Sequence, residues 1–313
     1  MDHSQVKQRY CTEPIETIIE PRTLDQVNRE YADQAVRLGA AVAEDCLARA
    51  GMKASHVDLF ITVSCTGVMI PSLDAHLANR FGFRSDVRRL PITELGCAAG
   101  AAALAYAADY LRAYPNATVL VVGVELPSLT FQRYDTSQAN LDLLDPVWRR
   151  RRRPPSSRGD GAARGPRIAR TESFLFPDSL DAMGFDLQTS GFHIVLSRDV
   201  PELIRKEVRG LVDGFLGTCR RAARGARRLH RASRRPEAPD FHRGRARASA
   251  VDTECSWHVL REYGNQSSVS VLFVLHEWLA RACAAPGSPC GWSPRSGPGS
   301  AQTCPAALGV SRR

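Results

Sequence analysis

The chain has 313 residues, of which 43% are hydrophobic, and its formal net charge is +9. This length and apolar content suffice for one large or two medium domains with a substantial core. The longest apolar runs have the length of a strand, far below the roughly twenty residues that a membrane-spanning helix needs. The polar N-terminus has no signal-peptide core. These features argue against a membrane protein and predict a cytoplasmic one.

The positive charge is concentrated in two segments. Residues 146–170 carry a net charge of +8 and residues 219–250 one of +9, which leaves −8 for the rest of the chain. Few aromatic residues accompany these arginines, so the stacking platforms that nucleic-acid bases need are lacking. We therefore expect no specific nucleic-acid partner, although a disordered arginine-rich segment would still bind polyanions nonspecifically.

Outside those segments, helical and strand-like patterns alternate. In chain order they predict a helix over 24–50, a strand over 57–63, a helix over 73–81, a strand up to residue 97, a helix up to residue 114 and a strand over 117–124. Such alternation is typical of an α/β protein with helices on the faces of a sheet. A second, similar unit is expected from a strand over 191–197, a helix over 200–215 and a strand over 268–275.

Cys97 is the first candidate for chemistry. It lies between the strand-like segment 87–94 and the alanine-rich helical segment 101–114, which places it at the N-terminus of a helix. Unpaired backbone N–H groups and the helix dipole favour a thiolate at such a position. The very small neighbouring residues would leave room for a substrate. The alternative is a buried cysteine in a tightly packed helix.

Asn265 is the second candidate, because it follows Gly264 at a turn before an apolar run. An asparagine at a turn often does no more than satisfy nearby backbone groups. Together with Cys97, however, it indicates a catalytic pair. The nine cysteines form no Cys-x-x-Cys pair, so neither a disulfide framework nor a metal site is predicted.

Four stretches, 64–74, 95–104, 176–193 and 263–265, resemble the type III polyketide synthases, the chalcone-synthase-like branch of the thiolase-fold condensing enzymes. Segments 64–74 and 183–186 look closest to bacterial alkylpyrone or alkylresorcinol synthases. The resemblance implies a thiolase-like α/β fold with two similar halves in a five-layer αβαβα sandwich. Here residues 1–168 would carry the nucleophile Cys97, and residues 169–313 would carry Asn265.

The same resemblance implies the activity. Family members load an acyl group from an acyl-CoA starter onto the cysteine and extend it by decarboxylative condensation with malonyl-CoA to pyrone- or resorcinol-type products. Histidine and asparagine stabilise the enolate. The resemblance implies CoA thioesters as substrates, no metal or other cofactor, and a homodimer.

Four further residues would line the substrate cavity by the same resemblance: Cys65, Thr66, Met69 and Phe192. Met69 would reach into the partner subunit's cavity, and Phe192 would act as a gate. The alternative for Cys65, Met69 and Phe192 is ordinary core packing.

The family's catalytic histidine motif, similar to Val-His-Pro-Gly-Gly-Pro-Lys, has no counterpart here. Codons that can encode residues 231–239 spell that motif in full when they are read one base later. In the same way, codons that can encode residues 146–153 spell Leu-Phe-Gly-Asp-Gly-Ala-Ala when they are read one base later. Codons for the tail segment 291–302, read two bases later, can spell a sequence that resembles the family's Gly-Pro-Gly loop. We therefore predict frame changes within 146–165, 219–250 and 283–313.

Two consequences follow for the chain as written. His230 has neighbours that do not match the motif, and His193 aligns with a structural position, so neither is expected to replace the lost histidine. The family's first strand and helix also have no counterpart before residue 8, which predicts an N-truncated, incomplete first sheet with an unpaired edge. The activity is expected to be impaired.

Two alternative functions remain open from the sequence. One is a condensing enzyme like β-ketoacyl-ACP synthase III, which shares the fold and the three catalytic residue types but uses acyl carrier protein. The other is an inactive product of a frameshifted gene.

Overall fold

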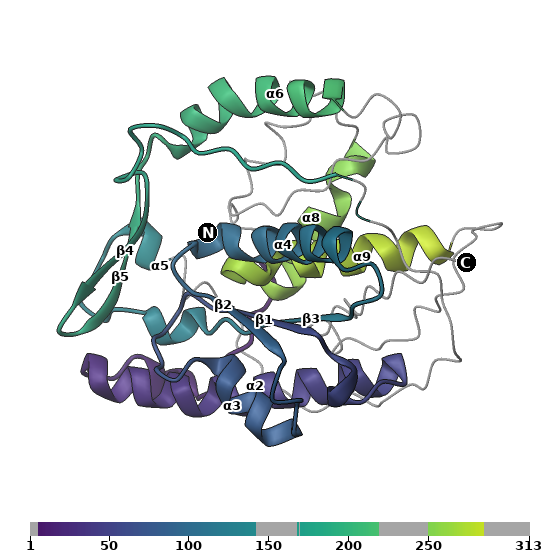
Figure 1. Ribbon diagram of the computed structural model, residues 1–313. Helices are drawn as coiled ribbons and strands as arrows, with labels where there is room; N and C mark the ends of the chain where they lie inside the picture. Colours follow the sequence, from purple (N-terminus) through teal and green to yellow (C-terminus); the bar gives the residue numbers. More distant parts are fainter. Residues whose placement is uncertain (1–5, 142–167, 169, 219–249, 285–313) are drawn as a thin grey trace.

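The computed structural model describes residues 6–141, 168, 170–218 and 250–284 (Figure 1). His230 and the segment 146–165 lie outside the described residues, as do residues 219–249 and 285–313. Within the part that is described, no helix combines the length and the apolar character needed to cross a bilayer.

The elements follow in chain order. The α-helices are α1 (Ile15–Ile18), α2 (Leu24–Ala50), α3 (Leu73–Phe81), α4 (Ala99–Ala113), α5 (Gln138–Leu141), α6 (Val200–Thr218), α8 (Ala250–Tyr263) and α9 (Ser270–Ala284). Short 3₁₀ turns are η1 (Ala54–His56), η2 (Gly96–Ala98), η3 (Pro127–Thr130) and η4 (Ser267–Val269). The strands are β1 (Leu59–Val63), β2 (Arg88–Ile92), β3 (Val119–Gly123), β4 (Met183–Gln188) and β5 (Gly191–Leu196).

A parallel sheet with the strand order β2-β1-β3 forms the centre of the first region. Side chains alternate across the sheet, so Phe60 and Leu120 pack with α2 and α3, whereas Ile61 and Val121 pack with α4. Figure 1 shows the sheet between α2 and α3 on one side and α4 and α9 on the other. The predicted α/β architecture with helices on both sheet faces is confirmed for this region.

The longest helix, α2, has clear end signals. Thr23 and Gln26 form a capping box, in which each side chain accepts a hydrogen bond from the other residue's backbone. Gly51 ends the helix with φ of +62°, a left-handed conformation that glycine adopts without steric cost. The helices predicted over 24–50 and 73–81 are both confirmed at those bounds.

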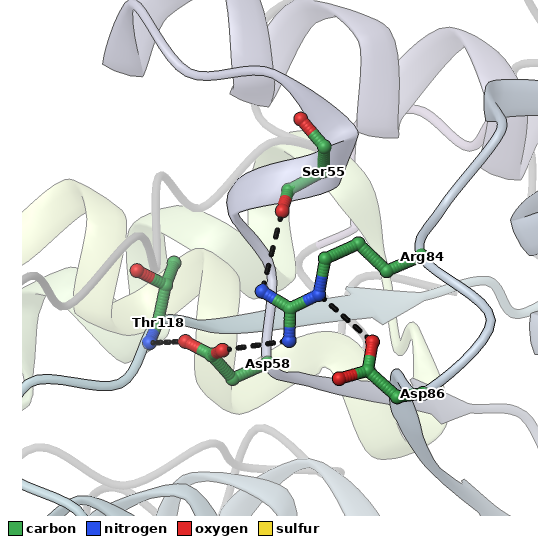
Figure 2. Close-up of polar contacts among 5 residues, drawn as sticks. All are labelled: Ser55, Asp58, Arg84, Asp86 and Thr118. Carbon is green, nitrogen blue, oxygen red and sulfur yellow. Dashed lines mark hydrogen bonds and ion pairs between the residues drawn. The ribbon is translucent and has the colours of Figure 1, made fainter.

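An arginine joins the three strand starts of the parallel sheet (Figure 2). The Arg84 guanidinium donates to Asp58 at 3.0 Å and to Asp86 at 2.9 Å. It also donates to the Ser55 carbonyl at 3.4 Å. Asp58 in turn accepts a hydrogen bond of 2.8 Å from the backbone N–H of Thr118. Because Asp58, Asp86 and Thr118 precede β1, β2 and β3, the network ties together the amino edge of the sheet.

The second region, residues 170–218, contains an antiparallel hairpin, β4–β5, in which Phe185 is paired with Ile194. Phe185 and Phe192 meet edge to face, with ring centroids 5.6 Å apart. The helix α6 follows. The strand and helix predicted over 191–197 and 200–215 are confirmed, whereas the proposed division of the chain at residue 168 stays a prediction.

The strand predicted over 268–275 is wrong. This segment forms η4 and the first turns of α9. The helix α9 packs between α4 and α8, and Val269, Leu272, Phe273 and Val274 are all buried. A helix buried on several sides has an apolar run without a visible period of 3.6, so its pattern cannot be told from that of a buried strand.

Candidate active site

Cys97 lies in the turn between β2 and α4. Gly96 directly before it has φ of +52°, so the chain reverses sharply there and η2 leads straight into α4. The thiol is half-buried. The predicted position of Cys97 at a helix N-terminus, after a strand, is therefore confirmed.

The small residues after Cys97 serve close packing. A Cβ added at Gly100 would lie 2.0 Å from the backbone carbonyl oxygen of Ser268, so only glycine lets α4 approach η4 this closely. Ala99, Ala103 and Ala107 are buried against the parallel sheet. The small side chains thus bring the Cys97 turn against η4, whereas the sequence had suggested that they leave room for a substrate.

The hydroxyl of Ser267 connects two thiols. Its Oγ lies 3.2 Å from the Sγ of Cys97 and 3.2 Å from the Sγ of Cys65. Cys65 follows β1 and is buried, with 7% of its surface exposed. Sequence reasoning did not single out Ser267. The signal that could have found it is its place two residues after Asn265.

Asn265 positions Ser267. The Asn265 Oδ1 accepts a hydrogen bond of 2.9 Å from the backbone N–H of Ser267, and Ser267 adopts a positive φ of 49°. This local bond is the bland role that asparagine often has at a turn. Here it also brings the Ser267 hydroxyl to the thiols. Because Oδ1 makes that bond, the donor end of the amide, Nδ2, is the end that could bind a substrate oxygen.

A buried carboxyl group, Glu125, joins the loop after β1 to η4. It accepts hydrogen bonds from the Cys65 backbone N–H at 3.1 Å, from the Thr66 hydroxyl at 2.8 Å, and from the Ser268 hydroxyl. Burial raises the pKa of the Glu125 carboxyl above its usual range, while the hydrogen bonds, the one from Ser268 most strongly, act in the opposite direction. Sequence reasoning missed Glu125, although an acidic residue directly after the buried run 119–124 was a visible signal.

These groups share one edge of the sheet. Cys65, Cys97 and Glu125 follow the carboxyl ends of β1, β2 and β3, opposite the edge that Arg84 ties together. In open α/β sheets, ligands bind outside the carboxyl ends of the parallel strands. The structure thus brings Cys97 and Cys65 to the Asn265–Ser267 turn, and Glu125 anchors both Cys65 and Thr66 there.

Met69 and Phe192 have other surroundings. The Met69 side chain packs against the core formed by α2 and α3 and lines a cavity of about 20 Å³ together with Tyr31. Burial raises the pKa of Tyr31 to about 12, and its hydroxyl donates to Ser64 at 2.7 Å. Phe192 contacts Phe185 in the hairpin. The substrate-cavity roles of Met69 and Phe192 stay predictions.

Of the two histidines considered as replacements for the lost one, His193 belongs to the described residues. His193 contacts the Ser190 hydroxyl at 2.7 Å within the β5 hairpin, in agreement with a structural position. The described residues contain no group of three or more His, Cys, Asp or Glu side chains arranged to hold a metal ion.

Comparison with known proteins identifies the family. The family profile of the N-terminal domain of chalcone and stilbene synthases matches residues 3–145. The 1,3,6,8-tetrahydroxynaphthalene synthase of Streptomyces peucetius subsp. caesius is 35% identical over 300 residues, which cover 90% of this chain and 76% of that enzyme. The chain belongs to the chalcone and stilbene synthase family. These enzymes are the type III polyketide synthases, acyltransferases that act by decarboxylative condensation.

Solved structures confirm the thiolase-like α/β fold. The crystal structure of 1,3,6,8-tetrahydroxynaphthalene synthase from Streptomyces coelicolor A3(2), described there as a bacterial type III polyketide synthase, matches with a TM-score of 0.76 and 31% identity. The match covers 87% of this chain and 78% of that one. The protein CsyB complexed with CoA-SH shares the fold, with a TM-score of 0.71 at 16% identity, over 88% of this chain and 80% of its own. The narrower likeness to alkylpyrone or alkylresorcinol synthases stays a prediction.

Proposed function

We propose that Cys97 is the acyl-carrying nucleophile of this type III polyketide synthase and that Asn265 stabilises the developing negative charge. The observation that supports this most strongly is the convergence of the Cys97 thiol and the Asn265–Ser267 turn at the carboxyl edge of the parallel sheet. A nucleophile at a helix N-terminus beside fixed hydrogen-bond donors is the arrangement that acyl transfer requires.

The reaction follows from these positions. The Cys97 thiolate attacks the carbonyl carbon of an acyl-CoA starter, and CoA leaves as its thiolate. Malonyl-CoA then loses carbon dioxide, and the Nδ2 of Asn265 donates to the oxygen of the resulting enolate. The enolate carbon attacks the Cys97 thioester, and Cys97 is released as a thiolate. Fixed donors stabilise such an oxyanion without reorganisation during the reaction.

Free CoA thioesters are the substrates in this proposal. The CoA-SH complex of a protein with the same fold and the polyketide synthase relatives described above support it. The naphthalene product in the name of the 35% identical relative is aromatic and polyhydroxylated, which agrees with a resorcinol- or pyrone-type product here. The same relatives favour the polyketide branch over an enzyme like β-ketoacyl-ACP synthase III.

We include a homodimer in the proposal. Val68 and Ile70, in the loop after β1, are apolar but 47% and 94% exposed. Neighbouring exposed apolar residues are typical of a protein interface, and a second copy could cover them. Both residues flank Met69, the predicted cross-subunit contact.

A cytoplasmic location is the last part of this proposal. The five cysteines that the structure describes in full are free thiols, as is usual for proteins of a reducing compartment.

The chain as written would be an impaired form of this enzyme. The family match of the N-terminal domain ends at residue 145, directly before the first segment with a predicted frame change. Residues 231–239, whose codons would spell the histidine motif only in a shifted frame, lie outside the described residues. Without that histidine, the enolate would lose one of its two stabilising donors, and the rate of condensation would fall. If the rate of condensation fell to zero, the chain would be an inactive gene product.

The test begins with resequencing of the coding DNA across codons 140–165, 215–255 and 280–313, which shows whether the predicted frame changes are present. The chain as written and a version with restored reading frame are then incubated with radiolabelled malonyl-CoA and an acyl-CoA starter. The restored enzyme should release labelled triketide or tetraketide products, and the chain as written should release almost none. Product from the chain as written would contradict the impairment, and no product from the restored enzyme would contradict the function.

Substitution of the nucleophile sharpens this test. In the restored enzyme, Cys97→Ala should lower product formation by at least about a thousandfold, because no thioester can form. Cys11→Ala is the matched control. Cys11 is half-buried, and burial raises its pKa to about 11, so it is an unreactive thiol whose loss should leave the rate unchanged.

A further inference from the structure

The condensation uses one thiol, yet two thiols meet at the site. Cys65 and Cys97 come from different strand ends, and each places its Sγ 3.2 Å from the same hydroxyl oxygen, that of Ser267. The two sulfur atoms are therefore separated by at most twice that distance. The Cys65 thiol is buried and takes no part in the reaction described above.

We propose that Cys97 and Cys65 form a reversible disulfide when the protein meets hydrogen peroxide. The inference rests on the proposed function only in that Cys97 is the reactive thiol. The Ser267 hydroxyl lies within hydrogen-bonding distance of both sulfurs. Its rotation away from them, with rotation of the two cysteine side chains, would let the sulfurs approach bonding distance.

The oxidation of the two thiols proceeds in two steps. The Cys97 thiolate attacks one oxygen of hydrogen peroxide, the O–O bond breaks, and the departing hydroxide takes up a proton to give water. Cys97 is then a sulfenic acid. The Cys65 sulfur attacks this sulfur, the S–O bond breaks, and the departing hydroxide takes the proton of the Cys65 thiol to become water. Two thiols are oxidised to one disulfide, and one peroxide is reduced to two waters.

The other described cysteines are less suited to this role. Cys46 is buried in the core that α2 and α3 form with the parallel sheet, and Cys255 is buried in the core around α8 and α9. The raised pKa of Cys11 keeps it protonated at neutral pH. Among the described cysteines, Cys65 and Cys97 are the two that contact a common atom.

The disulfide would make the enzyme inactive and would protect Cys97 from irreversible oxidation. It removes the nucleophile, and it prevents further oxidation of Cys97 to a sulfinic acid, which thiols do not reverse. A reducing dithiol would restore both thiols.

The experiment uses the full chain. Folded protein is treated with hydrogen peroxide, remaining thiols are alkylated in denaturant, and peptides are separated without reduction and identified by mass. We expect one dominant cross-linked pair, containing Cys65 and Cys97 and lighter by two hydrogen atoms, which dithiothreitol removes. It should exceed any other cysteine pair by about tenfold, because the fold holds these two thiols together. A mixture of random pairs, or oxidised Cys97 without linked Cys65, would overturn the proposal.

Variants separate this proposal from simple damage. In Cys65→Ser and Cys65→Ala, peroxide should drive Cys97 to a sulfinic acid that dithiothreitol does not reverse, whereas Cys46→Ser should keep the linked pair. Protein oxidised in guanidinium should lose the preference for this pair, which checks that the fold directs it. The readout needs no catalysis: if the enzyme with restored reading frame makes no polyketide but forms the linked peptide, the result contradicts the proposed function alone.

Discussion

The central strand of the parallel sheet, β1, and the first strand of the hairpin, β4, are buried to different degrees. All five residues of β1 are buried, because helices cover both faces of the parallel sheet. In the hairpin β4–β5, most residues of β4 are exposed, and Leu187 and the nearby Leu180 are 55% and 99% exposed. The apolar residues of β1 are thus buried on both faces of the sheet, whereas several apolar residues among the described residues of the second region are exposed. Cys65, Cys97 and Glu125 of the candidate active site thus lie at the edge of the well-packed parallel sheet.

The largest expected effect tests this contrast in packing. Phe60 is fully buried in β1 and stacks on Phe83 with ring centroids 5.0 Å apart. Phe60→Ala should lower the free energy of unfolding by about 3–5 kcal/mol, because the mutation leaves a cavity between the sheet and α2. The matched change in the second region, Leu187→Ala, should cost about 0.5 kcal/mol or less. Denaturant titration followed by circular dichroism measures both, and equal losses would show that the hairpin is as tightly packed as the sheet.

A pair of glycines tests the same contrast at smaller scale. Gly100→Ala should lower the free energy of unfolding by about 1–3 kcal/mol, because its methyl group would collide with the Ser268 carbonyl oxygen and separate α4 from η4. Gly210 lies within α6 with nothing within 4 Å of an added Cβ. Gly210→Ala should therefore stabilise the protein by about 0.5–1 kcal/mol through its higher helix propensity. Thermal unfolding of both variants measures the difference, and a stabilising Gly100→Ala would refute the close contact.

The smallest effect is a pH dependence from Glu125. Its pKa is raised in the folded protein, so the folded state binds a proton more tightly than the unfolded chain. Its contribution to stability is fully present below the ordinary pKa of glutamate and is lost as the pH rises through the raised pKa. Glu125→Gln, which mimics the protonated form, should flatten this decline in the free energy of unfolding above pH 4.5.

An exposed carboxyl is the control for that measurement. The hydrogen bond from Arg84 lowers the pKa of Asp86, so its contribution has the opposite sign: it is present above the ordinary aspartate pKa and lost as the pH falls. Asp86→Asn should leave the decline seen with Glu125 unchanged. An identical pH profile for wild type and Glu125→Gln would show that the buried carboxyl does not hold its proton.

Much of the first region could be predicted because its signals are local. The capping box at Thr23 and the turn before Cys97 are readable within a few residues of sequence. The convergence of Cys65 and Cys97 on Ser267 joins residues 202 and 170 positions apart, so no local pattern records it. The same limit explains the wrong strand over 268–275, because packing of α9 between α4 and α8 hides the helical period. Glu125 was missed because its partners come from two distant loops.

The Arg84 network has a consequence for the divergence of this enzyme in evolution. It fixes the alignment of β1, β2 and β3 from their amino ends, through Asp58, Asp86 and Thr118. Cys65, Cys97 and Glu125 of the candidate site follow the opposite ends of the same strands. The contacts that align the sheet and the groups of the site are thus set at opposite ends of the strands, so that either set can change without direct contact with the other. Loops around Cys97 can accumulate changes that alter the product while a distant guanidinium keeps the strands in register.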